Sequence, residues 1–457
     1  MTDQTLPQQW LSTPLENVIL QITGGGTPSK SKPEYYRGDI PWMSVKDMNK
    51  HVLDDTIDHI SSEAVKNSST NIIPAGTPII ATRMSLGKIV VAHFDSAINQ
   101  DLKALFLSSG MHRDYLVYWY RSIAHKIEQL GTGTTVKGIR LEVLKALEFA
   151  LPPLAEQKVI ADKLDTLLAQ VDSTKARLER IPEILKRFRQ SVLAAAVSGR
   201  LTEDWRISNQ VHDSWQKIDF SALTCQLRSG SAEKPNDDIE GVPILRSSAV
   251  RPREIDFSDI KYLSDPKSLK DNNYLKEKDL LFTRLSGSAE YVGNCAMVRD
   301  IERECQYPDR LFCARLKDPQ QGPFLEYFFA SQDFREHIAR SLKSSAGHQR
   351  ITLDVIKRAV VPLPSVAEQT EIVRRVDQLF AYADTVERQV NSALERVNQL
   401  TQSILAKAFR GELTAQWRAD NPELISGENS AEALLERIKE ERAAQAPKKR
   451  TRKKAKA

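Results

Sequence analysis

Two segments of the chain carry the same pattern of apolar and polar positions. Residues 151–206 begin with LPPLAEQ and end with GRLTEDWR, and residues 363–418 begin with LPSVAEQ and end with GELTAQWR. The segments align without a gap, and 21 of the 56 aligned positions are identical. Ordinary composition would give about 3 to 4 identities by chance. The chain is therefore a tandem duplication.

Apolar residues in each segment recur at steps of four and three. A seven-residue period held for this long predicts a helix of about 40 residues, roughly 60 Å long, with the narrow apolar seam of a left-handed coiled coil. We expect the two seams to pack against each other within one molecule; the alternative is two amphipathic helices, each lying on a larger core. The expected interface residues are Ile160, Leu164, Leu167, Val171, Leu178, Leu185, Val192, Ile372, Val376, Leu379, Val390, Val397 and Ile404.

Particular residues mark the ends and the middle of these predicted helices. Gly199 and Gly411 follow the last apolar turn of each segment, where helices often stop in a left-handed conformation. Pro182 lies inside the first helix and should kink it, because proline lacks the N–H that the helix needs. Its counterpart in the second segment is Leu394.

A globular stretch precedes each long helix, and the two stretches share one order of predicted elements. Each opens on a tryptophan, Trp10 or Trp215, which we interpret as a core anchor. A strand and a hairpin follow, the hairpin marked by two apolar runs around a Ser/Gly loop. A helix with an aromatic stripe comes next, at 114–129 and at 324–342, and then a polar loop. These stretches are predicted to be mixed α/β (α+β) heads.

The pattern thus divides the chain into two unlike heads and two alike helices. This arrangement suits a protein that reads two different things at a fixed separation. The predicted parts are 1–150 (first head), 151–206 (central long helix), 207–362 (second head), 363–418 (C-terminal long helix) and 419–457 (a further helix and a basic, disordered tail).

Charge is concentrated at one end of the chain. The net charge is +5 over 457 residues, yet the last ten residues, KKRTRKKAKA, hold seven Lys or Arg. Subtracting those seven charges leaves −2 for the rest, so any nucleic-acid surface on the heads must be local. The tail itself is either a solubilising end or a weak phosphate contact.

Other sequence features favour a cytoplasmic binding protein. No apolar run approaches the 18 or more residues of a membrane span, and the N-terminus lacks the pattern of a signal peptide. The four cysteines show no metal-site spacing and are expected to be reduced. No catalytic motif is found, and Gly24–Ser29 lacks the order of a phosphate-binding loop, so it is interpreted as a tight turn.

The most suggestive loops follow the first strand of each predicted hairpin. In both heads this strand ends in Thr-Arg before the Ser/Gly loop, at Thr82-Arg83 and at Thr283-Arg284. We expect these pairs and the loops after them to contact a ligand surface.

The paired LPxxAEQ and GxLTxxWR motifs resemble those of the specificity subunit of bacterial type I restriction–modification enzymes. The resemblance covers essentially the whole chain; Pro182 and Glu203-Asp204, which stand where the second copy has Leu and Ala-Gln, are the departures. It implies two target recognition domains joined by two long antiparallel helices in a pseudo-two-fold arrangement. Each domain would read one half of a bipartite, asymmetric DNA target, and the chain itself would not be catalytic.

The resemblance also implies partners and cofactors. The chain would bind double-stranded DNA and two modification (methyltransferase) subunits, which methylate adenine with S-adenosylmethionine. Restriction (endonuclease/translocase) subunits would use ATP and Mg²⁺ to translocate and cut DNA. This chain would bind no cofactor itself, and its repeated helices and AEQ turns would dock the modification subunits.

Within this picture, polar and basic loop residues become candidates for DNA contact, since base edges are distinguishable in the major groove and phosphates attract cations. For each cation the alternative is a solvated surface charge. Candidates for a base or phosphate are Arg83, Arg246 and Arg284; candidates for phosphate are Lys88, Lys137, Arg251, Arg253 and Arg350; the loop residues Thr82, Ser85, Thr283 and Ser286 complete the expected DNA-binding set.

Three other functions stay open at this point. A stand-alone DNA-binding regulator would bind tightly without modification subunits. An enzyme would carry an active site that no motif reveals, and a structural scaffold would show no sequence-dependent DNA binding. Assays of the purified chain for methyl transfer, DNA cleavage and sequence-specific binding separate these functions from the favoured one.

Overall fold

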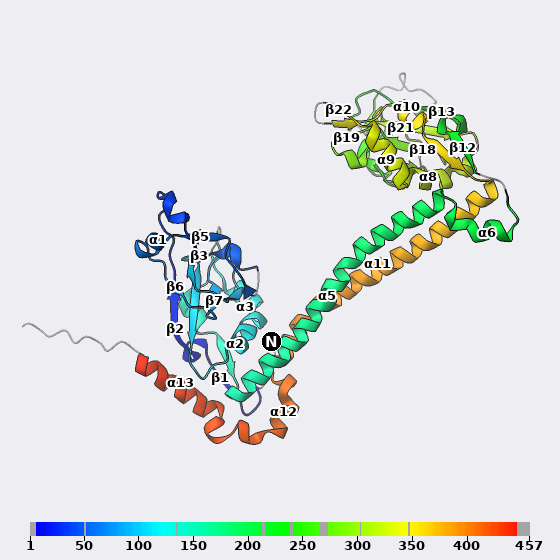
Figure 1. Ribbon diagram of the computed structural model, residues 1–457. Coiled ribbons are helices and arrows are strands. Elements are labelled where there is room, and N and C mark those ends of the chain that lie inside the picture. Colours follow the sequence, from blue (N-terminus) through cyan, green and yellow to red (C-terminus); the bar gives the residue numbers. More distant parts are fainter. Residues whose placement is uncertain are drawn as a thin grey trace, which may run out of the picture. The chain divides into compact units, whose positions relative to one another are not determined.

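The computed structural model describes residues 6–49, 52–133, 136–212, 215–237, 239, 241–264, 273–301, 303–345 and 348–445. The chain forms two compact units (Figure 1). Unit 1 comprises residues 1–177 and 393–457, and unit 2 comprises residues 178–392. Both long helices are divided between the units. The predicted five-part division, with each helix as a separate part, stays a prediction.

The first head, in unit 1, is built on two sheets. One has the strand order β2-β10-β7-β8-β4 and the other β5-β3-β9-β6, and β1 pairs separately with β11. The strands are β1 (Leu11–Pro14), β2 (Ile19–Gly24), β3 (Ile40–Met43), β4 (Val52–Leu53), β5 (Asp58–Ile60), β6 (Ile72–Ile73), β7 (Pro78–Ala81), β8 (Ile89–Ala92), β9 (Ser96–Ile98), β10 (Leu102–Leu107) and β11 (Glu148–Leu151).

The second head, in unit 2, repeats the central sheet and varies the rest. Its main sheet has the order β13-β21-β18-β20, with β12–β24, β14–β17, β15–β16 and β19-β23-β22 beside it. The strands are β12 (Gln216–Asp219), β13 (Thr224–Ser229), β14 (Val242–Leu245), β15 (Val250–Arg251), β16 (Glu254–Ile255), β17 (Ile260–Leu263), β18 (Leu280–Thr283), β19 (Leu285–Ser286), β20 (Cys295–Met297), β21 (Leu311–Leu316), β22 (Lys343–Ser345), β23 (His348–Arg350) and β24 (Val360–Leu363).

The order β2-β10-β7-β8 in the first head matches β13-β21-β18-β20 in the second. The predicted hairpins are confirmed, because β7 pairs antiparallel with β8 and β18 pairs antiparallel with β20. All four residues of β7, β8 and β18 are buried. These three strands are therefore covered on both faces, and the loops at their ends reach the surface.

The single helix predicted after each hairpin is wrong in both heads. The first head has α2 (Arg113–Ser122) and α3 (Ala124–Leu130), and the second has α8 (Gly322–Ala330) and α9 (Gln332–Ser341). In the second head the break has a clear cause, because the Ser331 side chain caps α9 by accepting a hydrogen bond from the Phe334 amide. The aromatic stripes lie in the cores, as predicted; Trp119 and Phe149, for example, pack with ring centroids 4.7 Å apart. Besides the two long helices, the other helices are α1 (Ser62–Lys66), α4 (Leu141–Lys145), α6 (Glu203–Ser208), α7 (Phe220–Leu223), α10 (Leu353–Lys357), α12 (Ala415–Asp420) and α13 (Ala431–Gln445).

The two repeated segments form the long helices α5 (Leu154–Val197) and α11 (Val366–Phe409), each of 44 residues. Helix α5 continues through Pro182 as one element. After each helix a glycine stops the chain in the left-handed region, Gly199 with φ 77° and Gly411 with φ 75°. The glycine positions were predicted from the sequence, and a side chain at this φ would be strained.

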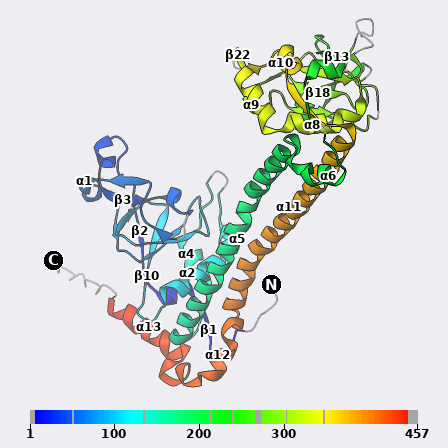
Figure 2. The same ribbon diagram turned by 45° about the vertical axis from the view of Figure 1, so that its right-hand side comes forward.

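The long helices pack together in each unit, and this part of the fold prediction is confirmed (Figure 2). In unit 1, Ile160 and Leu164 from the start of α5 share a core with Leu405 and Ala408 from the end of α11. In unit 2, the end of α5 shares a core with the start of α11, so the helices run antiparallel. All thirteen predicted interface residues are buried or half-buried.

The packing differs from a bare coiled-coil seam in one respect. At both ends of the helix pair the seam residues belong to the core of the neighbouring head. The Ile160 cluster contains Tyr115 and Phe149 of the first head, and the Ile372 cluster contains Phe324 of the second. Each head is thus anchored on the helices by shared apolar burial, which is the main stabilising term available.

A buried carboxylate joins distant parts of unit 1. Glu156, from the first AEQ turn, is fully buried. It accepts hydrogen bonds from Trp10 Nε1 at 2.9 Å, Thr414 Oγ1 at 2.6 Å and Arg418 Nη1 at 2.5 Å. The first AEQ turn is therefore bound by the GELTAQWR motif of the second repeat and by the opening tryptophan. A buried charge is stable only when it is paired in this way.

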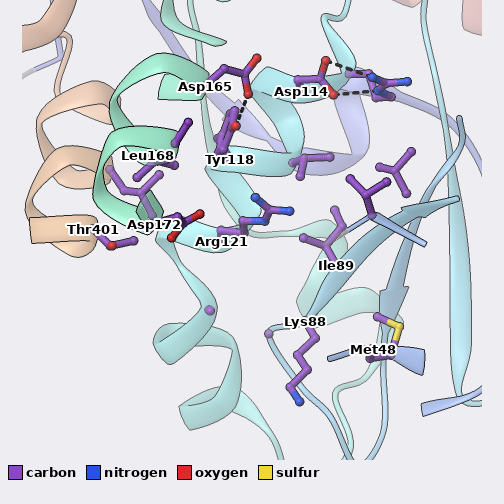
Figure 3. A pocket seen from close by; sticks show the side chains of 18 of the residues that line it. Met48, Lys88, Ile89, Asp114, Tyr118, Arg121, Asp165, Leu168, Asp172 and Thr401 are labelled. Carbon is purple, nitrogen blue, oxygen red and sulfur yellow. Dashed lines mark hydrogen bonds and ion pairs between the residues drawn. The ribbon is translucent and has the colours of Figure 1, made fainter. Parts of the chain in front are cut away.

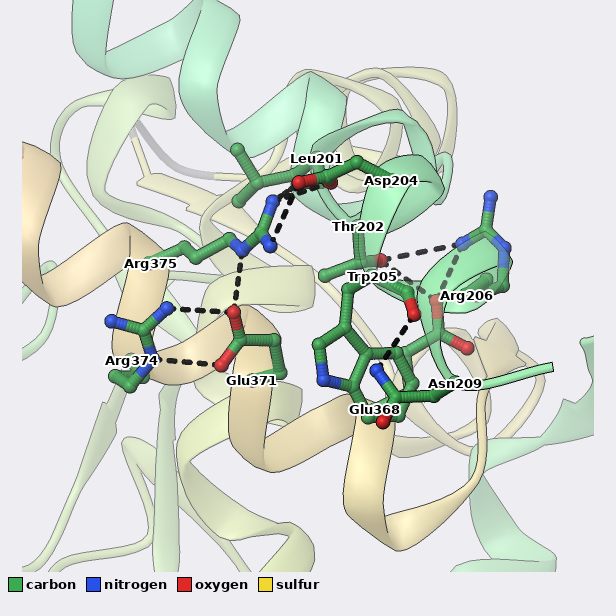
Figure 4. A network of polar contacts seen from close by, with 10 residues as sticks. All are labelled: Leu201, Thr202, Asp204, Trp205, Arg206, Asn209, Glu368, Glu371, Arg374 and Arg375. Atoms are coloured by element: carbon green, nitrogen blue, oxygen red, sulfur yellow. Dashed lines mark hydrogen bonds and ion pairs between the residues drawn. The ribbon is translucent and has the colours of Figure 1, made fainter. Parts of the chain in front are cut away.

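Unit 2 contains the equivalent polar network around Glu368 (Figure 4). Glu368, from the second AEQ turn, accepts hydrogen bonds from Thr202 Oγ1 at 2.7 Å, Arg206 Nη1 at 2.5 Å and Trp215 Nε1 at 3.0 Å. Each AEQ turn is thus held by the GxLTxxWR motif of the other repeat. The sequence identity of these motifs reflects two equivalent polar networks.

The AEQ turns, which were expected to dock the modification subunits, direct their Glu and Gln side chains into the protein. Glu156, Gln157, Glu368 and Gln369 are all buried, at most 4% exposed. Gln157 accepts a hydrogen bond from the His112 amide and donates one to the Pro152 carbonyl. These side chains make their hydrogen bonds inside the chain.

The departure at Glu203-Asp204 also has a structural counterpart. In unit 2, Arg375 donates hydrogen bonds to the Leu201 carbonyl at 2.8 Å and to Asp204 Oδ1 at 2.6 Å (Figure 4). In unit 1 the equivalent cation is Lys163, which donates at 2.8 Å to the carbonyl of Leu413, the equivalent of Leu201. The Arg375 guanidinium can bind a carboxylate through two N–H groups, and Asp204 supplies that carboxylate. Lys163 is a point charge without this two-pronged geometry, and the segment that it meets has Ala-Gln in place of Glu203-Asp204.

Helix α13 completes the core of the first head. Its buried residues Leu434 and Ile438 belong to the same apolar cluster as Leu105 and Phe149. At the same contact, Glu441 accepts a hydrogen bond from the Ser109 amide at 3.1 Å. The predicted C-terminal helix is thus present. The basic tail, residues 448–457, lies outside the described residues.

Candidate nucleic-acid interface

In the first head, the Thr-Arg loop is fixed against the polar loop that follows α3. The Met84 amide donates to the Lys137 carbonyl at 3.0 Å, and the Ile139 amide donates to the Thr82 carbonyl at 2.9 Å. Thr132 and Gly138 close the polar loop with two backbone hydrogen bonds of 2.8 and 2.9 Å. Two loops that are separated in the sequence therefore form one surface.

The second head brings its corresponding loops together by strand pairing. Strand β19, which follows the Thr-Arg pair, lies antiparallel to β23, and β23 pairs with β22. The Ile351 amide also donates to the Arg284 carbonyl at 3.1 Å. Each head thus presents one composite surface made of two equivalent loops, whose bonded residues are 53 to 67 positions apart in the sequence.

Thr82 and Thr283, which were predicted to contact DNA, are both buried. Their exposed fractions are 6% and 3%. Thr82 Oγ1 donates to the Asp101 carbonyl at 3.0 Å, and its amide donates to the same carbonyl at 2.8 Å. The Thr283 amide donates to the Asn294 carbonyl at 3.0 Å. Both threonines anchor the loops from inside the sheet, and the arginines that follow them reach the surface.

Three predicted cations are exposed on the first head. Arg83 lies 3.6 Å from Asp101 Oδ1 and is 55% exposed in its side chain. Lys88 donates to Asn49 Oδ1 at 2.6 Å, and Lys137 is exposed on the second loop. Ser85, which follows Met84 in the Thr-Arg loop, is half-buried. The surface combines positive charge with hydroxyl and backbone donors, as phosphate contact requires.

On the second head the predicted residues are more firmly held. Arg284 donates to the Asp309 carbonyl at 3.0 Å, and its guanidinium lies 5.7 Å from the centre of the Phe312 ring. Arg350 of β23 is exposed. It lies next to Arg284 in space, because it pairs with Leu285 across β19 and β23. Ser286, the next residue of β19, is half-buried. A preorganised arginine loses less side-chain entropy on binding than a free one.

The other predicted arginines of the second head lie apart from this pair of loops. Arg246 makes an ion pair with Asp259 at 3.3 Å and is 53% exposed in its side chain. Arg251 is exposed, with its guanidinium 5.6 Å from the centre of the Tyr291 ring. Both are accessible, so a role at phosphate stays a prediction for each.

Arg253 serves a different purpose from the one predicted. Its guanidinium lies 4.5 Å from the ring centre of Tyr327 and 4.9 Å from that of Phe380, a residue of α11. It also lies 3.9 Å from Glu326, a buried carboxylate that Arg299 binds through both of its oxygens. Arg253 therefore ties a loop of the head to the long helix, and its expected phosphate contact is not supported.

A cavity of about 740 Å³ lies at the corresponding place in unit 1 (Figure 3). Tyr118 of α2 donates a hydrogen bond to Asp165 of α5 across it, and the Arg121 guanidinium lies 5.4 Å from the Tyr118 ring centre. Burial lowers the pKa of Arg121. Lys88 and Asp172 also line this cavity. Because cations and carboxylates are mixed along its wall, its charge favours no single class of ligand.

Sequence reasoning missed the head-to-helix contacts made by Tyr118 and Tyr327. Tyr118 bonds Asp165, and Tyr327 bonds Asp377, at equivalent positions of the two repeats. Burial and these hydrogen bonds raise the pKa of both tyrosines, so the phenols stay protonated and donate. The identity of Asp165 and Asp377 between the repeats was a signal, since both are polar positions beside an apolar seam.

The described residues hold no group of three or more His, Cys, Asp or Glu side chains arranged to bind a metal ion. Burial raises the pKa of the Cys305 thiol to about 11 and raises those of Cys295 and Cys313 well above their ordinary value. These thiols are therefore protonated near neutral pH, which makes them poor nucleophiles. Within the described part of the chain, no helix is both long enough and apolar enough for a membrane span.

A family model described as the type I restriction modification DNA specificity domain matches residues 9–183 and 228–396. The chain belongs to this family of specificity subunits. It is a DNA specificity subunit and not itself catalytic, as the resemblance of its repeated motifs implied. The first match covers most of the first head and runs into α5, and the second, which begins within β13, covers most of the second head and runs into α11.

Similar proteins cover the whole length of this specificity subunit. The EcoKI specificity subunit of Escherichia coli (strain K12) is 43% identical over 466 residues, which cover 100% of both chains. The StySPI specificity subunit of Salmonella potsdam is 41% identical, covering 98% of this chain and 99% of its own. These comparisons confirm the identification made from the paired motifs.

Solved structures confirm the fold. The crystal structure of the HsdS subunit from Thermoanaerobacter tengcongensis matches with a TM-score of 0.58 and 17% identity, covering 90% of this chain and 99% of that one. A chain from a structural study of type I restriction–modification complex assembly and conformational transition matches with a TM-score of 0.66 and 17% identity, covering 89% and 99%. At this identity the likeness concerns the architecture of heads and paired helices alone.

Proposed function

We propose that this specificity subunit recognises a bipartite, asymmetric DNA target, one half with each head. The observation that carries the proposal is the composite loop surface found on both heads. Each surface joins a Thr-Arg loop to a polar loop by backbone hydrogen bonds, and each exposes cations. The loops share a scaffold and differ in sequence, so two heads of one fold would read two different half-sites.

The residues proposed to contact DNA are those of the predicted set that reach the surface. They are Arg83, Ser85, Lys88 and Lys137 on the first head and Arg246, Arg251, Arg284, Ser286 and Arg350 on the second. Arginine binds guanine edges bidentately in the major groove, whereas lysine suits phosphate as a point charge. We assign base contact to Arg83 and Arg284 because their loops form the centre of each composite surface.

The partners follow from the family. The proposed assembly contains two modification subunits, which methylate adenine with S-adenosylmethionine, and restriction subunits that use ATP and Mg²⁺. The exposed faces of α5 and α11 would dock the modification subunits, since the AEQ side chains are buried. The assembly would act in the cytoplasm, where the host DNA lies.

Methylome sequencing of a host that expresses the complex tests this proposal. Wild-type complex should methylate adenines within a split sequence that has two specified halves. Arg83→Ala should relax or abolish specificity in one half only, and Arg284→Ala in the other only. A target that changes in both halves with either substitution would contradict the division of labour between heads. Tight sequence-specific binding by the chain alone, with no modification activity on adding modification subunits, would favour a stand-alone regulator.

A further inference from the structure

The loop surface of the first head carries an exposed methionine in an unusual backbone conformation. Met84 has a φ of 64°, and its residue is 63% exposed. The Ser85 amide donates to the Arg83 carbonyl at 2.7 Å, so these three residues close a tight γ-turn with Met84 at its centre. A turn of this kind with positive φ is rare, and for a residue with a Cβ it is strained.

Among the described residues, the Met84 side chain is too exposed for burial to favour a methionine at this position. Its side chain gains little from burial, and glycine would adopt the same φ without steric cost. The conformation is nonetheless imposed by its surroundings, because the Met84 amide is bonded to the Lys137 carbonyl. The loop returns to the sheet through Gly87, where a Cβ would lie 2.7 Å from the Ala124 carbonyl oxygen. Strain held in place by neighbouring structure is typical of a functional position.

The surroundings of Met84 match the chemistry of a DNA groove. Val136, next to the residue that fixes the Met84 amide, is 41% exposed and adds a second apolar side chain. Arg83 precedes Met84 in the loop, and Lys137 accepts the hydrogen bond from the Met84 amide; both cations are exposed. An exposed apolar side chain flanked by two cations is suited to a base edge between phosphates. In the major groove the one apolar group offered by a base pair is the C5 methyl of thymine.

We propose that Met84 contacts the methyl group of one thymine in the half-site read by the first head. The inference rests on the proposed function and adds a specificity-determining residue to it. Methionine suits this contact, because its unbranched, polarisable side chain adapts to small apolar targets. The equivalent residue of the second head, Leu285, lies in β19, pairs with Arg350 and is half-buried. The contact therefore belongs to the first head alone.

Replacing thymine with uracil removes the methyl group and leaves the Watson–Crick pairing intact, which makes a direct test. The specificity subunit is assembled with its modification subunits, and its target is first defined by methylome sequencing. Duplexes that carry uracil at one thymine at a time are then titrated against wild type, Met84→Ala, Met84→Leu and Leu285→Ala. The affinity of wild type should fall about threefold to fivefold at one thymine, the loss expected for one buried methyl group.

The variants make the result specific to Met84. Met84→Ala should bind the thymine and uracil duplexes equally at that position, whereas Met84→Leu and Leu285→Ala should retain the wild-type difference. Equal uracil losses in wild type and Met84→Ala at every thymine, or a target without thymine, would overturn the inference and leave the proposed function standing. A wild-type complex that does not distinguish its target from a scrambled duplex would overturn both.

Discussion

The Glu156 carboxylate accepts a 2.5 Å hydrogen bond from the Arg418 guanidinium, although the two residues are 262 positions apart in the sequence. Glu368 and Arg206 make the same contact at 2.5 Å in unit 2. Because the repeats exchange these motifs, each unit depends on residues from both copies. The two copies of the duplicated sequence are therefore not independent folding modules.

Removing either buried carboxylate should destabilise one unit only. Glu156→Ala leaves Arg418, Trp10 and Thr414 without their acceptor, and breaking a buried ion pair typically costs about 3–5 kcal/mol. Calorimetry should show the transition of unit 1 at lower temperature, and Glu368→Ala should lower that of unit 2 instead. Equal shifts of both transitions by either variant would contradict the assignment of each carboxylate to its own unit.

Acid should weaken unit 2 through Glu371. Hydrogen bonds from Arg374 and Arg375 lower the pKa of Glu371 to about 2, against roughly 4.3 in an unfolded chain. Because the folded state holds this proton less tightly, the stabilisation is complete above about pH 4.5 and is lost as the pH falls toward 2. The unfolding transitions of wild type and Glu371→Gln should therefore differ at pH 6 and converge near pH 2.5.

The control for this pH series is Glu179→Gln, a change at an exposed residue of α5 within the same unit. It should follow wild type at every pH. A difference between wild type and Glu371→Gln that stays constant from pH 6 to pH 2.5 would show that the charge of Glu371 does not stabilise the fold.

Helix α13 should be required for the stability of the first head. Leu434 and Ile438 are at most 1% exposed, and truncating such residues to Ala costs about 2–5 kcal/mol each. Chemical denaturation of Leu434→Ala should shift the unit 1 transition and leave that of unit 2 in place. Glu440→Ala, on the exposed side of the same helix, serves as the control. Loss of stability in both variants alike would point to the helix itself rather than to its buried face.

Two arginines of the second head should affect DNA binding in different ways. Arg284→Ala should weaken binding to the target by about 1–3 kcal/mol and relax specificity at one position. Arg350→Ala should weaken binding uniformly across sequences and reduce the slope of affinity against salt by about one. Gel-shift titrations on target and scrambled duplexes over a salt series measure both effects. Unchanged affinity would remove Arg284 from the interface.

The long helices are expected to set the number of unread base pairs between the half-sites. Four residues inserted after Ala176 add about one turn, or roughly 6 Å, to α5. Methylome sequencing should then show a longer non-specific spacer between unchanged half-sites. A matched insertion in α11, at the equivalent position, keeps the helix pair in register and serves as the companion variant. An unaltered spacer in both would refute this role of the helices.

The helices and hairpins could be predicted because their signals are local. The apolar period of the repeats, with Gly199 and Gly411 as stops, fixes α5 and α11 within the sequence itself. The break at Ser331 was missed because an aromatic stripe continues across it, and only the capping contact to the Phe334 amide distinguishes it. Periodicity locates a helix well, and it locates a cap inside a longer apolar pattern poorly.

The polar contacts could not be predicted, because they join residues far apart in sequence. Glu156 was recognisable as part of a motif, yet nothing local showed that Arg418 binds it from the other repeat. Thr82 was placed on the surface because a loop follows it, whereas the hydrogen bond to the Asp101 carbonyl draws it into the sheet. Arg253 was assigned to phosphate by its charge alone, and its aromatic neighbours on α8 and α11 give it a structural role.

The placement of Leu405, Ala408, Leu434 and Ile438 in the first head's core has a consequence for biosynthesis. Domains generally form as they leave the ribosome, in order from the N-terminus. Here unit 2 is fully translated once residue 392 has emerged, while the head synthesised first still waits for its missing apolar partners. The opening head is therefore the last to mature, and a ribosome that stalls late would release a chain with one finished head and one unfinished.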